Sequence, residues 1–278
     1  MTNNPDDQTK KLKPESYAGY GNEEASRWMA RRTAERQAAF FLPHLRPGME
    51  VLDCGCGPGT ITVGLARRAA PGQCVGIDID ATQVELARAH AASQGVTNVR
   101  FEAATIYELP FADASFDAVY SNTVIGWLDD PLAALREIYR VLRVGGVVGI
   151  RSGDAGGSLF APANPVIERF WTLFDAVVSQ GGGNPLLGRE HRALLRQAGF
   201  VNIVASATYE SYGTEEDVRL WGQTIAKMFS TEAQVEQFIQ LGSNPSEIEA
   251  MHQAWLAWAE EPDAFLADVR CEAVGWKQ

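Results

Sequence analysis

The stretch that decides the fold is Val51-Leu52-Asp53-Cys54-Gly55-Cys56-Gly57-Pro58-Gly59-Thr60. A short apolar strand runs into three closely spaced glycines, and a helical pattern follows over residues 60–70. Glycines allow a tight turn and a close approach of the backbone to a ligand, because they carry no Cβ. In open parallel sheets, ligands bind at the carboxyl ends of the strands, and the first strand-to-helix turn lies there. The stretch therefore predicts a ligand site at this turn.

Strand-like and helix-like segments alternate beyond the turn. Such alternation is typical of βαβ units, in which helices cover both faces of a mostly parallel sheet. The predicted fold class is therefore α/β, with a doubly wound sheet. The expected strands cover residues 50–54, 74–79, 99–104, 116–121 and 147–151, and the expected helices cover residues 23–41, 60–70, 81–94 and 131–143.

The second half of the chain is richer in helices and in tryptophan. Its predicted helices cover residues 164–180, 188–198, 215–240 and 246–260, and its predicted strands cover residues 201–209 and 265–276. We expect a flexible tail over residues 1–15 and a single domain over residues 16–278. Helical segments at about residues 157–182 and 214–262 are predicted to form a cap near the carboxyl edge of the sheet.

Composition and charge restrict the classes of molecule that this protein is expected to bind. The 278 residues carry a net charge of −11 and 46% of them are hydrophobic, and an acidic chain lacks the basic face that nucleic acid requires. The polar start has no apolar signal-peptide core, and no apolar run reaches the length of a membrane span. Four cysteines without a second pair or a nearby histidine predict neither disulfides nor a metal site. We expect a cytoplasmic protein with a small-molecule partner; its oligomeric state is left open.

Two carboxylates accompany the glycine turn. Asp53 precedes the glycines, and Asp78 ends the second predicted strand, where an acid can accept hydrogen bonds from a ribose diol. The spacing G-x-G-x-G around Pro58 differs from the G-x-G-x-x-G that seats a pyrophosphate at a helix N-terminus. Asp53 would repel a phosphate and suits a cation. The combination favours an adenosine-type ligand without a pyrophosphate.

An ordered series of motifs carries a family resemblance. Its members are Leu52-Asp53-x-Gly55-Cys56-Gly57-Pro58-Gly59, Gly76-Ile77-Asp78, Leu109-Pro110-Phe111-x-Asp113-x-Ser115-Phe116-Asp117, Asp130-Pro131, Glu137-x-x-Arg140-Val141-Leu142 and Gly145-Gly146. In these motifs the chain resembles the class I S-adenosylmethionine-dependent methyltransferases, and in particular their ubiquinone/menaquinone-biosynthesis-like branch. The resemblance implies a seven-stranded Rossmann-like sheet whose last strand is antiparallel and ends near Trp276.

The resemblance also implies a cofactor, S-adenosylmethionine, which leaves as S-adenosylhomocysteine. Asp53 would meet its ammonium directly or through water, Asp78 would hold its ribose, and Arg32 would reach its carboxylate. Thr105 and Ile106 would border the adenine. The full set of implied cofactor-binding residues is Arg32, Asp53, Gly55, Cys56, Gly57, Gly59, Asp78, Ile79, Thr105, Ile106, Asn122 and Thr123.

The chain departs from the family pattern at two places. Ala104-Thr105-Ile106 stands where the family often has Gly-Asp-Ala, so the usual acid near the adenine amine is missing. Asn122 and Trp127 stand in a region where family members often carry histidines. No acid–base pair is evident, and the weak candidates for a catalytic group are Asp154, Tyr20 and Asn122.

The predicted activity is methyl transfer, by in-line displacement, to a small, apolar or aromatic metabolite. Three alternatives remain open. The chain could bind the cofactor without catalysis, or use the bound cofactor for other chemistry. A nicotinamide-dependent oxidoreductase is the third alternative, which the glycine spacing disfavours.

Overall fold

Eight strands form one mixed sheet in the computed structural model, which describes residues 23–278. The strand order is β3-β2-β1-β4-β5-β8-β6, and β7 pairs with β8 as well. The strands are β1 (Val51–Cys54), β2 (Cys74–Asp78), β3 (Val99–Ala103), β4 (Phe116–Asn122), β5 (Leu142–Gly153), β6 (Leu159–Ala161), β7 (Val201–Tyr212) and β8 (Phe265–Trp276).

The predicted fold class is confirmed. Strands β1 to β5 pair in parallel, and β8 runs antiparallel to β5 and β7. From β1 the chain proceeds outward to β2 and β3 on one side, and it returns to β4 and β5 on the other. The strand order therefore reverses between β1 and β4, which is where open α/β sheets bind ligands.

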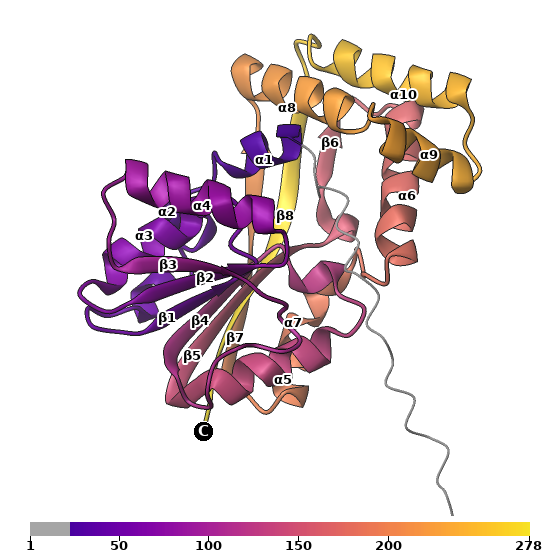
Figure 1. The fold of residues 1–278 in the computed structure, drawn as a ribbon. Coiled ribbons are helices and arrows are strands. Elements are labelled where there is room, and N and C mark those ends of the chain that lie inside the picture. The colour runs from indigo at the N-terminus through magenta and orange to yellow at the C-terminus, as the bar shows by residue number, and fades with distance from the viewer. Residues whose placement is uncertain (1–22) are drawn as a thin grey trace, which may run out of the picture.

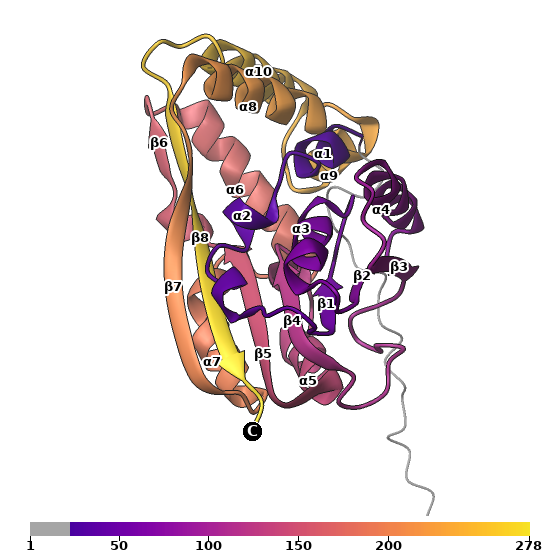
Figure 2. The same cartoon turned by 90° about the vertical axis from the view of Figure 1, so that its left-hand side faces the viewer.

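Helices cover both faces of the sheet. In Figure 1, α3 and α4 lie on one face and α5 and α7 on the other, while α6, α8, α9 and α10 gather at one end of the molecule, as Figure 2 also shows. The helices are α1 (Glu23–Met29), α2 (Ala34–Gln37), α3 (Thr60–Ala69), α4 (Ala81–Ser93), α5 (Pro131–Val141), α6 (Pro165–Gln180), α7 (His191–Gln197), α8 (Glu215–Met228), α9 (Glu232–Gln240) and α10 (Pro245–Trp258). Short 3-10 turns are η1 (Leu42–His44), η2 (Ile125–Trp127), η3 (Ala155–Gly157) and η4 (Leu187–Glu190).

Each face of the sheet has its own hydrophobic core. Leu52 joins the core on the side of α5 and α7, and its neighbour Val51 joins the core on the side of α3. Adjacent residues of a strand point to opposite faces, which explains the continuous apolar runs of the central strands. A further core lies among α6, α8, α9 and α10 and includes Phe170, Trp221 and Trp255.

The predicted single helix over residues 23–41 is wrong. The chain forms α1, then leaves the helical conformation, and re-enters it at α2. Thr33 is extended (φ −132°, ψ 157°) and caps α2, since its side chain accepts a hydrogen bond from the backbone N–H of Arg36. Its own N–H donates to the side chain of Gln37 at 2.8 Å. These local bonds compete with a continuous helix.

The predicted helix over residues 215–240 is also wrong. It is divided into α8 and α9, because Thr231 caps α9 by accepting a hydrogen bond from the backbone of Gln234. The predicted helix over residues 188–198 begins as the turn η4 and becomes α-helical only at His191. Strand β6 was not expected; it pairs with β8. The last strand, over residues 265–276, lies where it was predicted.

Candidate functional site

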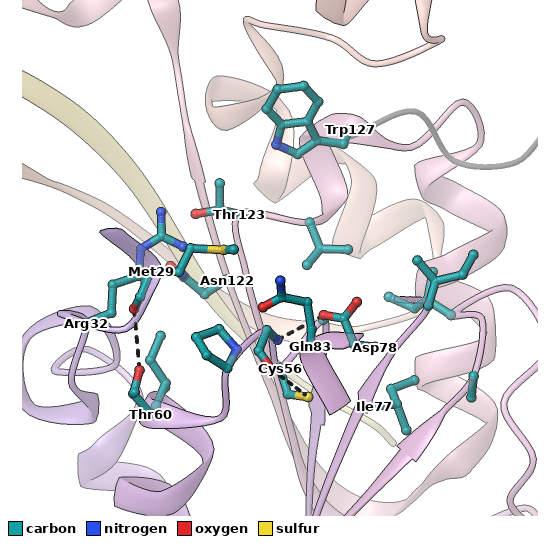
Figure 3. Close-up of a pocket in the computed structure, with 18 of the residues that line it drawn as sticks. Met29, Arg32, Cys56, Thr60, Ile77, Asp78, Gln83, Asn122, Thr123 and Trp127 are labelled. Atoms are coloured by element: carbon teal, nitrogen blue, oxygen red, sulfur yellow. Dashed lines mark hydrogen bonds between the residues drawn. The ribbon is translucent and has the colours of Figure 1, made fainter. Parts of the chain in front are cut away.

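A cavity of about 920 Å³, counted out to its open mouth, lies at the carboxyl ends of β1, β2 and β4 (Figure 3). A mostly apolar wall with a few polar side chains is typical of pockets that hold small molecules and cofactors. Segments from both sides of the strand-order reversal contribute to its wall. The lining residues are Met29, Arg32, Gly55, Cys56, Gly57, Pro58, Thr60, Ile61, Ile77, Asp78, Ile79, Gln83, Ala104, Ile106, Asn122, Thr123, Val124, Trp127 and Leu128.

The glycine turn forms the floor of the cavity. Gly55 adopts φ +78°, and a Cβ there would collide with Cγ2 of Val124. Gly57 adopts φ +51°, but a Cβ there would meet only the Met29 sulfur, at 3.7 Å. The face of Gly57 is therefore open to the cavity. Gly59 begins α3 and packs against Ala87, so it supports the turn from behind and does not line the cavity.

Asp78 lines the cavity at the end of β2, as predicted. One oxygen of its carboxylate accepts a hydrogen bond from the N–H of Gly57 at 2.9 Å, and the other accepts from the N–H of Asp80 at 3.0 Å. Burial raises the pKa of Asp78, although these backbone hydrogen bonds oppose the rise. The glycine turn thus fixes the carboxylate in place, with oxygen lone pairs left for a ligand.

Asp53 lies behind the turn and does not line the cavity. It is buried, and the hydroxyl of Thr62 donates to its carboxylate at 2.6 Å. Burial raises the pKa of Asp53 to about 7, against the effect of the Thr62 hydrogen bond and together with the nearby charge of Asp78. The predicted direct contact of Asp53 with a ligand in the cavity is therefore not available in this structure, which leaves only an effect of its charge.

Asn122 and Thr123 line the cavity at the end of β4, as expected. The Oδ1 atom of Asn122 accepts a hydrogen bond from Arg151 at 3.2 Å, and a guanidinium can only donate. The amide is therefore oriented with its N–H₂ group away from Arg151. Thr123 adopts φ +60°, a strained conformation for a β-branched residue, and its hydroxyl is buried without a hydrogen-bond partner among the described residues.

The break between α1 and α2 brings Met29 and Arg32 into the cavity wall. Figure 3 shows both residues on the same side of the cavity as Asn122 and Thr123. The hydroxyl of Thr60 donates to the carbonyl of Met29 at 3.5 Å, which joins the break to the start of α3. The Arg32 guanidinium makes neither an ion pair nor a hydrogen bond within residues 23–278, although its charge acts on the Glu210 carboxylate, so it is a cation with hydrogen-bond donors left for a ligand.

The opposite end of the cavity is apolar. Ile79, Ala104 and Ile106 line it, and Ile79 is 40% exposed. Thr105 was expected to border the same region but does not line the cavity; its hydroxyl accepts a hydrogen bond from the N–H of Tyr107 at 3.3 Å. Gln83, on α4, does line the cavity and donates to the hydroxyl of Ser26 on α1 at 2.7 Å.

Several lining residues escaped the sequence analysis. No motif marks four of them: Met29 at the end of α1, Gln83 on α4, and Val124 and Leu128 after β4. Trp127 was noted only as a departure from the family pattern. It lies in η2, and its ring contacts that of Phe174 on α6, with centroids 6.0 Å apart. Val124, Trp127 and Leu128 directly follow β4, the strand that borders the reversal of strand order, and this position was the signal that could have identified them.

Asp154, a candidate catalytic residue, is not brought into the cavity. Its buried carboxylate accepts hydrogen bonds from the backbone and the guanidinium of Arg189, at 2.6–3.0 Å, and it also caps η3. Burial alone would raise the pKa of Asp154, but the hydrogen bonds from Arg189 outweigh it and lower the pKa. These contacts are those of a structural residue. Tyr20, another candidate, lies outside the described residues.

Cys54 and Cys56 at the turn and Cys74 on β2 lie in the interior of the protein, and Cys56 also lines the cavity. Cys54, Cys56 and Cys74 are buried, and burial raises the pKa of each thiol well above its ordinary value. Residues 23–278 contain no group of three His, Cys, Asp or Glu side chains able to hold a metal ion. In the same residues, no helix combines the length and apolarity needed to cross a bilayer.

The fold and the cavity together define an α/β protein with a cofactor-type pocket at its strand-order reversal. A family model described as methyltransferase domain matches residues 52–150. The probable methyltransferase ltbC of Aspergillus luteorubrus is 33% identical, over 93% of this chain and 96% of its own length. The chain therefore belongs to the class I S-adenosylmethionine-dependent methyltransferase family.

Solved structures agree with the fold. The YcgJ protein of Bacillus subtilis matches with a TM-score of 0.58 at 21% identity, over 88% of this chain and 99% of its own. Phosphoethanolamine N-methyltransferase 2 of Haemonchus contortus, in complex with phosphomonomethylethanolamine and S-adenosylhomocysteine, matches with a TM-score of 0.54 at 19% identity, over 88% of this chain and 53% of its own.

Proposed function

We propose that this protein binds S-adenosylmethionine in the cavity and transfers its methyl group to a small, apolar or aromatic acceptor. The observation that carries the proposal is the Asp78 carboxylate, held by the N–H of Gly57 at the wall of a glycine-floored cavity. The ubiquinone/menaquinone-biosynthesis-like branch stays a prediction from the motifs quoted above.

The cavity suits each part of this cofactor. The open face of Gly57 leaves room for a ligand, in a space that a side chain at this position would fill. Asp78 would accept hydrogen bonds from the ribose, and the apolar end at Ile79 and Ile106 would hold the adenine. Arg32 and the amide of Asn122 offer donors to the cofactor carboxylate. The charge of Asp53, behind the turn, would favour the ammonium.

When bound, the cofactor supplies a methyl group activated by a positively charged sulfur. The chain's own contribution is to hold the acceptor in line with that methyl group, and such positioning can lower a barrier by several kcal/mol, roughly 7–11 at best. Among the described lining residues, Asp78 is the only carboxylate, and no histidine is present. Because Asp78 is assigned to the ribose in this proposal, we infer that the acceptor atom reaches the site ready to attack.

The wall nearest to η2 supports an apolar or aromatic acceptor. Trp127, Leu128 and Val124 line it, and Met29 faces them from α1. Figure 3 shows Trp127 at the end of the cavity away from the glycine turn. Aromatic walls bind flat apolar molecules through area burial and ring contacts.

The test has two parts. Isothermal titration calorimetry with S-adenosylhomocysteine should show binding, whereas binding of NADH without binding of S-adenosylhomocysteine would contradict the proposal. A screen with labelled S-adenosylmethionine against a metabolite extract, read by mass spectrometry, should yield a labelled product. In the variant Trp127→Ala, we expect product formation to fall at least about tenfold, while S-adenosylhomocysteine affinity changes less than about twofold. Cofactor binding with no labelled product in any extract would favour a non-catalytic role.

A further inference from the structure

A largely buried carboxylate on the strand β7, that of Glu210, joins two walls of the cavity; its side chain is 14% exposed. One oxygen of Glu210, Oε1, accepts a hydrogen bond from Nη2 of Arg151 at 2.9 Å and another from Nε2 of Gln37 at 3.0 Å. Arg151 is on β5 and Gln37 ends α2, so three distant segments of the chain meet at this atom. Glu210 itself does not line the cavity.

The first branch leads to the end of β4. Arg151 is 3% exposed, and its Nη1 donates to Oδ1 of Asn122 at 3.2 Å. Its Nε donates to Glu272 at 3.3 Å, so the guanidinium is held from two sides by carboxylates. Because Arg151 is fixed, the Asn122 amide keeps its oxygen toward Arg151 and offers its N–H₂ group elsewhere. Through Arg151, Glu210 thus determines that a ligand meets the N–H₂ group of Asn122 and not its oxygen.

The second branch leads to the break between α1 and α2. While Nε2 of Gln37 donates to Glu210, its Oε1 accepts from the backbone N–H of Thr33 at 2.8 Å. The carbonyl of Gln37 accepts from the hydroxyl of Tyr120 on β4 at 2.7 Å. Thr33 directly follows Arg32, so Gln37 holds the backbone that carries the cation of the cavity.

The surroundings keep Glu210 ionised. Burial alone would raise its pKa, but the guanidinium groups of Arg270, Arg151 and Arg32 outweigh burial and hold the pKa well below its usual range. Nε of Arg270 lies 3.4 Å from Oε2 of Glu210. The carboxylate is therefore a permanent acceptor that does not change over the working pH range.

We propose that Glu210 is a positioning residue: it orients Asn122 through Arg151 and Arg32 through Gln37, so that both offer hydrogen-bond donors to one anionic group of the ligand. The inference rests on the proposed function, in which that group is the carboxylate of S-adenosylmethionine or S-adenosylhomocysteine. It assigns a role in cofactor recognition to a residue outside the cavity.

The experiment measures S-adenosylhomocysteine affinity by calorimetry, below the melting temperature of every variant. Glu210→Gln should weaken binding about tenfold, the scale of one charge-assisted hydrogen bond. The matched control is Glu247→Gln, which removes a carboxylate paired with Arg169 at 3.0 Å; neither residue lines the cavity. This control should change the affinity less than about twofold, since distant sites contribute independently.

Measuring the same substitution in different mutant backgrounds distinguishes a positioning role of Glu210 from a general loss of stability. In the background Arg32→Met with Asn122→Ala, Glu210→Gln should cause less than about a twofold further loss, because the groups it orients are gone. Gln37→Met should weaken binding in the Asn122→Ala background and have no further effect in the Arg32→Met background. The Gln37→Met variant keeps the ion pair between Glu210 and Arg151, so the inference can still be tested with it if Glu210→Gln fails to fold.

Two outcomes would overturn the inference in distinguishable ways. If the unmodified protein binds S-adenosylhomocysteine but Glu210→Gln and Gln37→Met each cause the same fold-loss in every background, both residues are merely structural and the proposed function stands. If the unmodified protein does not bind S-adenosylhomocysteine, the proposed function fails and the role of Glu210 fails with it.

Discussion

Asp53 and Thr62 face each other behind the glycine turn, where the Thr62 hydroxyl donates a 2.6 Å hydrogen bond to the Asp53 carboxylate. This bond compensates only part of the cost of burying the acid, because the pKa of Asp53 still rises to about 7. The protein therefore keeps a costly charge beneath its ligand site. Stability is commonly given up at functional sites in this way.

We expect Asp53→Asn to stabilise the protein above pH 7 and to weaken S-adenosylhomocysteine binding. The unfolded acid ionises near its ordinary pKa of 3.8, whereas the folded acid ionises near 7. Burial of Asp53 thus costs stability as pH rises from about 4 to 7, by at most about 4 kcal/mol at 1.36 kcal/mol for each pKa unit. Urea unfolding at pH 5 and pH 8 measures the effect.

The control for that series is Asp263→Asn, which changes an exposed turn residue. Asp53→Asn should gain stability relative to the unmodified protein as pH rises, and Asp263→Asn should not. An equal pH dependence in Asp53→Asn and the unmodified protein would show that Asp53 does not titrate in this range.

His191 gives the opposite pH dependence. Its ring is buried, neither nitrogen has a hydrogen-bond partner among the described residues, and burial lowers its pKa to about 4 despite the nearby charge of Asp154. The unfolded histidine binds a proton near pH 6.5, so stability is lost as pH falls from about 6.5 to 4, by about 3 kcal/mol. His191→Leu should remove this loss in urea unfolding between pH 7 and pH 4. His44→Gln, which leaves the buried ring in place, should retain it.

Gly55→Ala and Gly57→Ala should separate folding from binding. Both residues have positive φ angles, which cost an alanine about 1 kcal/mol. In Gly55→Ala the new methyl also collides with Val124, so we expect a large drop in melting temperature. In Gly57→Ala the methyl enters the open cavity, so the protein should fold but bind S-adenosylhomocysteine at least about tenfold more weakly. Equal affinity in Gly57→Ala and the unmodified protein would place the ligand elsewhere.

Asp78→Ala should weaken S-adenosylhomocysteine binding by about 1.5–3 kcal/mol, the range for hydrogen bonds to a charged group. Calorimetry measures the change, and the exposed Asp263→Ala serves as the matched control. Circular dichroism is needed alongside, because Asp78 also accepts the N–H of Gly57. An unchanged affinity in a folded Asp78→Ala variant would remove this residue from the site.

The glycine turn, the central strands and the position of Asp78 could be predicted because their signals are local. A strand that ends in glycines needs no distant contact to be identified. The helix boundaries near Thr33 and Thr231 were missed, since the surrounding Ala-, Glu- and Gln-rich sequence favours a continuous helix. Thr231 with Gln234 three residues later does carry the pattern of a capping box, so that boundary had a readable signal.

The rest of the site depends on contacts between distant segments. Glu210 lies 173 positions from Gln37, and the sequence near either residue carries no sign of their hydrogen bond. Arg32 was singled out only through a family resemblance. The structure places it in the lining of the same cavity as Asn122 because α1 ends early, which propensity alone does not indicate.

The two ends of the cavity have separate supports. The wall at η2 is held by the hydrogen bond from the N–H of Asn184 to the carbonyl of Gly126 and by the contact of Trp127 with Phe174. None of these residues shares a hydrogen bond with Glu210 or Arg151 in the described part of the chain. We therefore expect substitutions of Trp127 and Phe174 to disturb the polar end less than substitutions of Arg151 or Glu210 do. Under the proposed function, such a division makes the protein evolvable: the acceptor specificity can change by mutation while cofactor binding is retained.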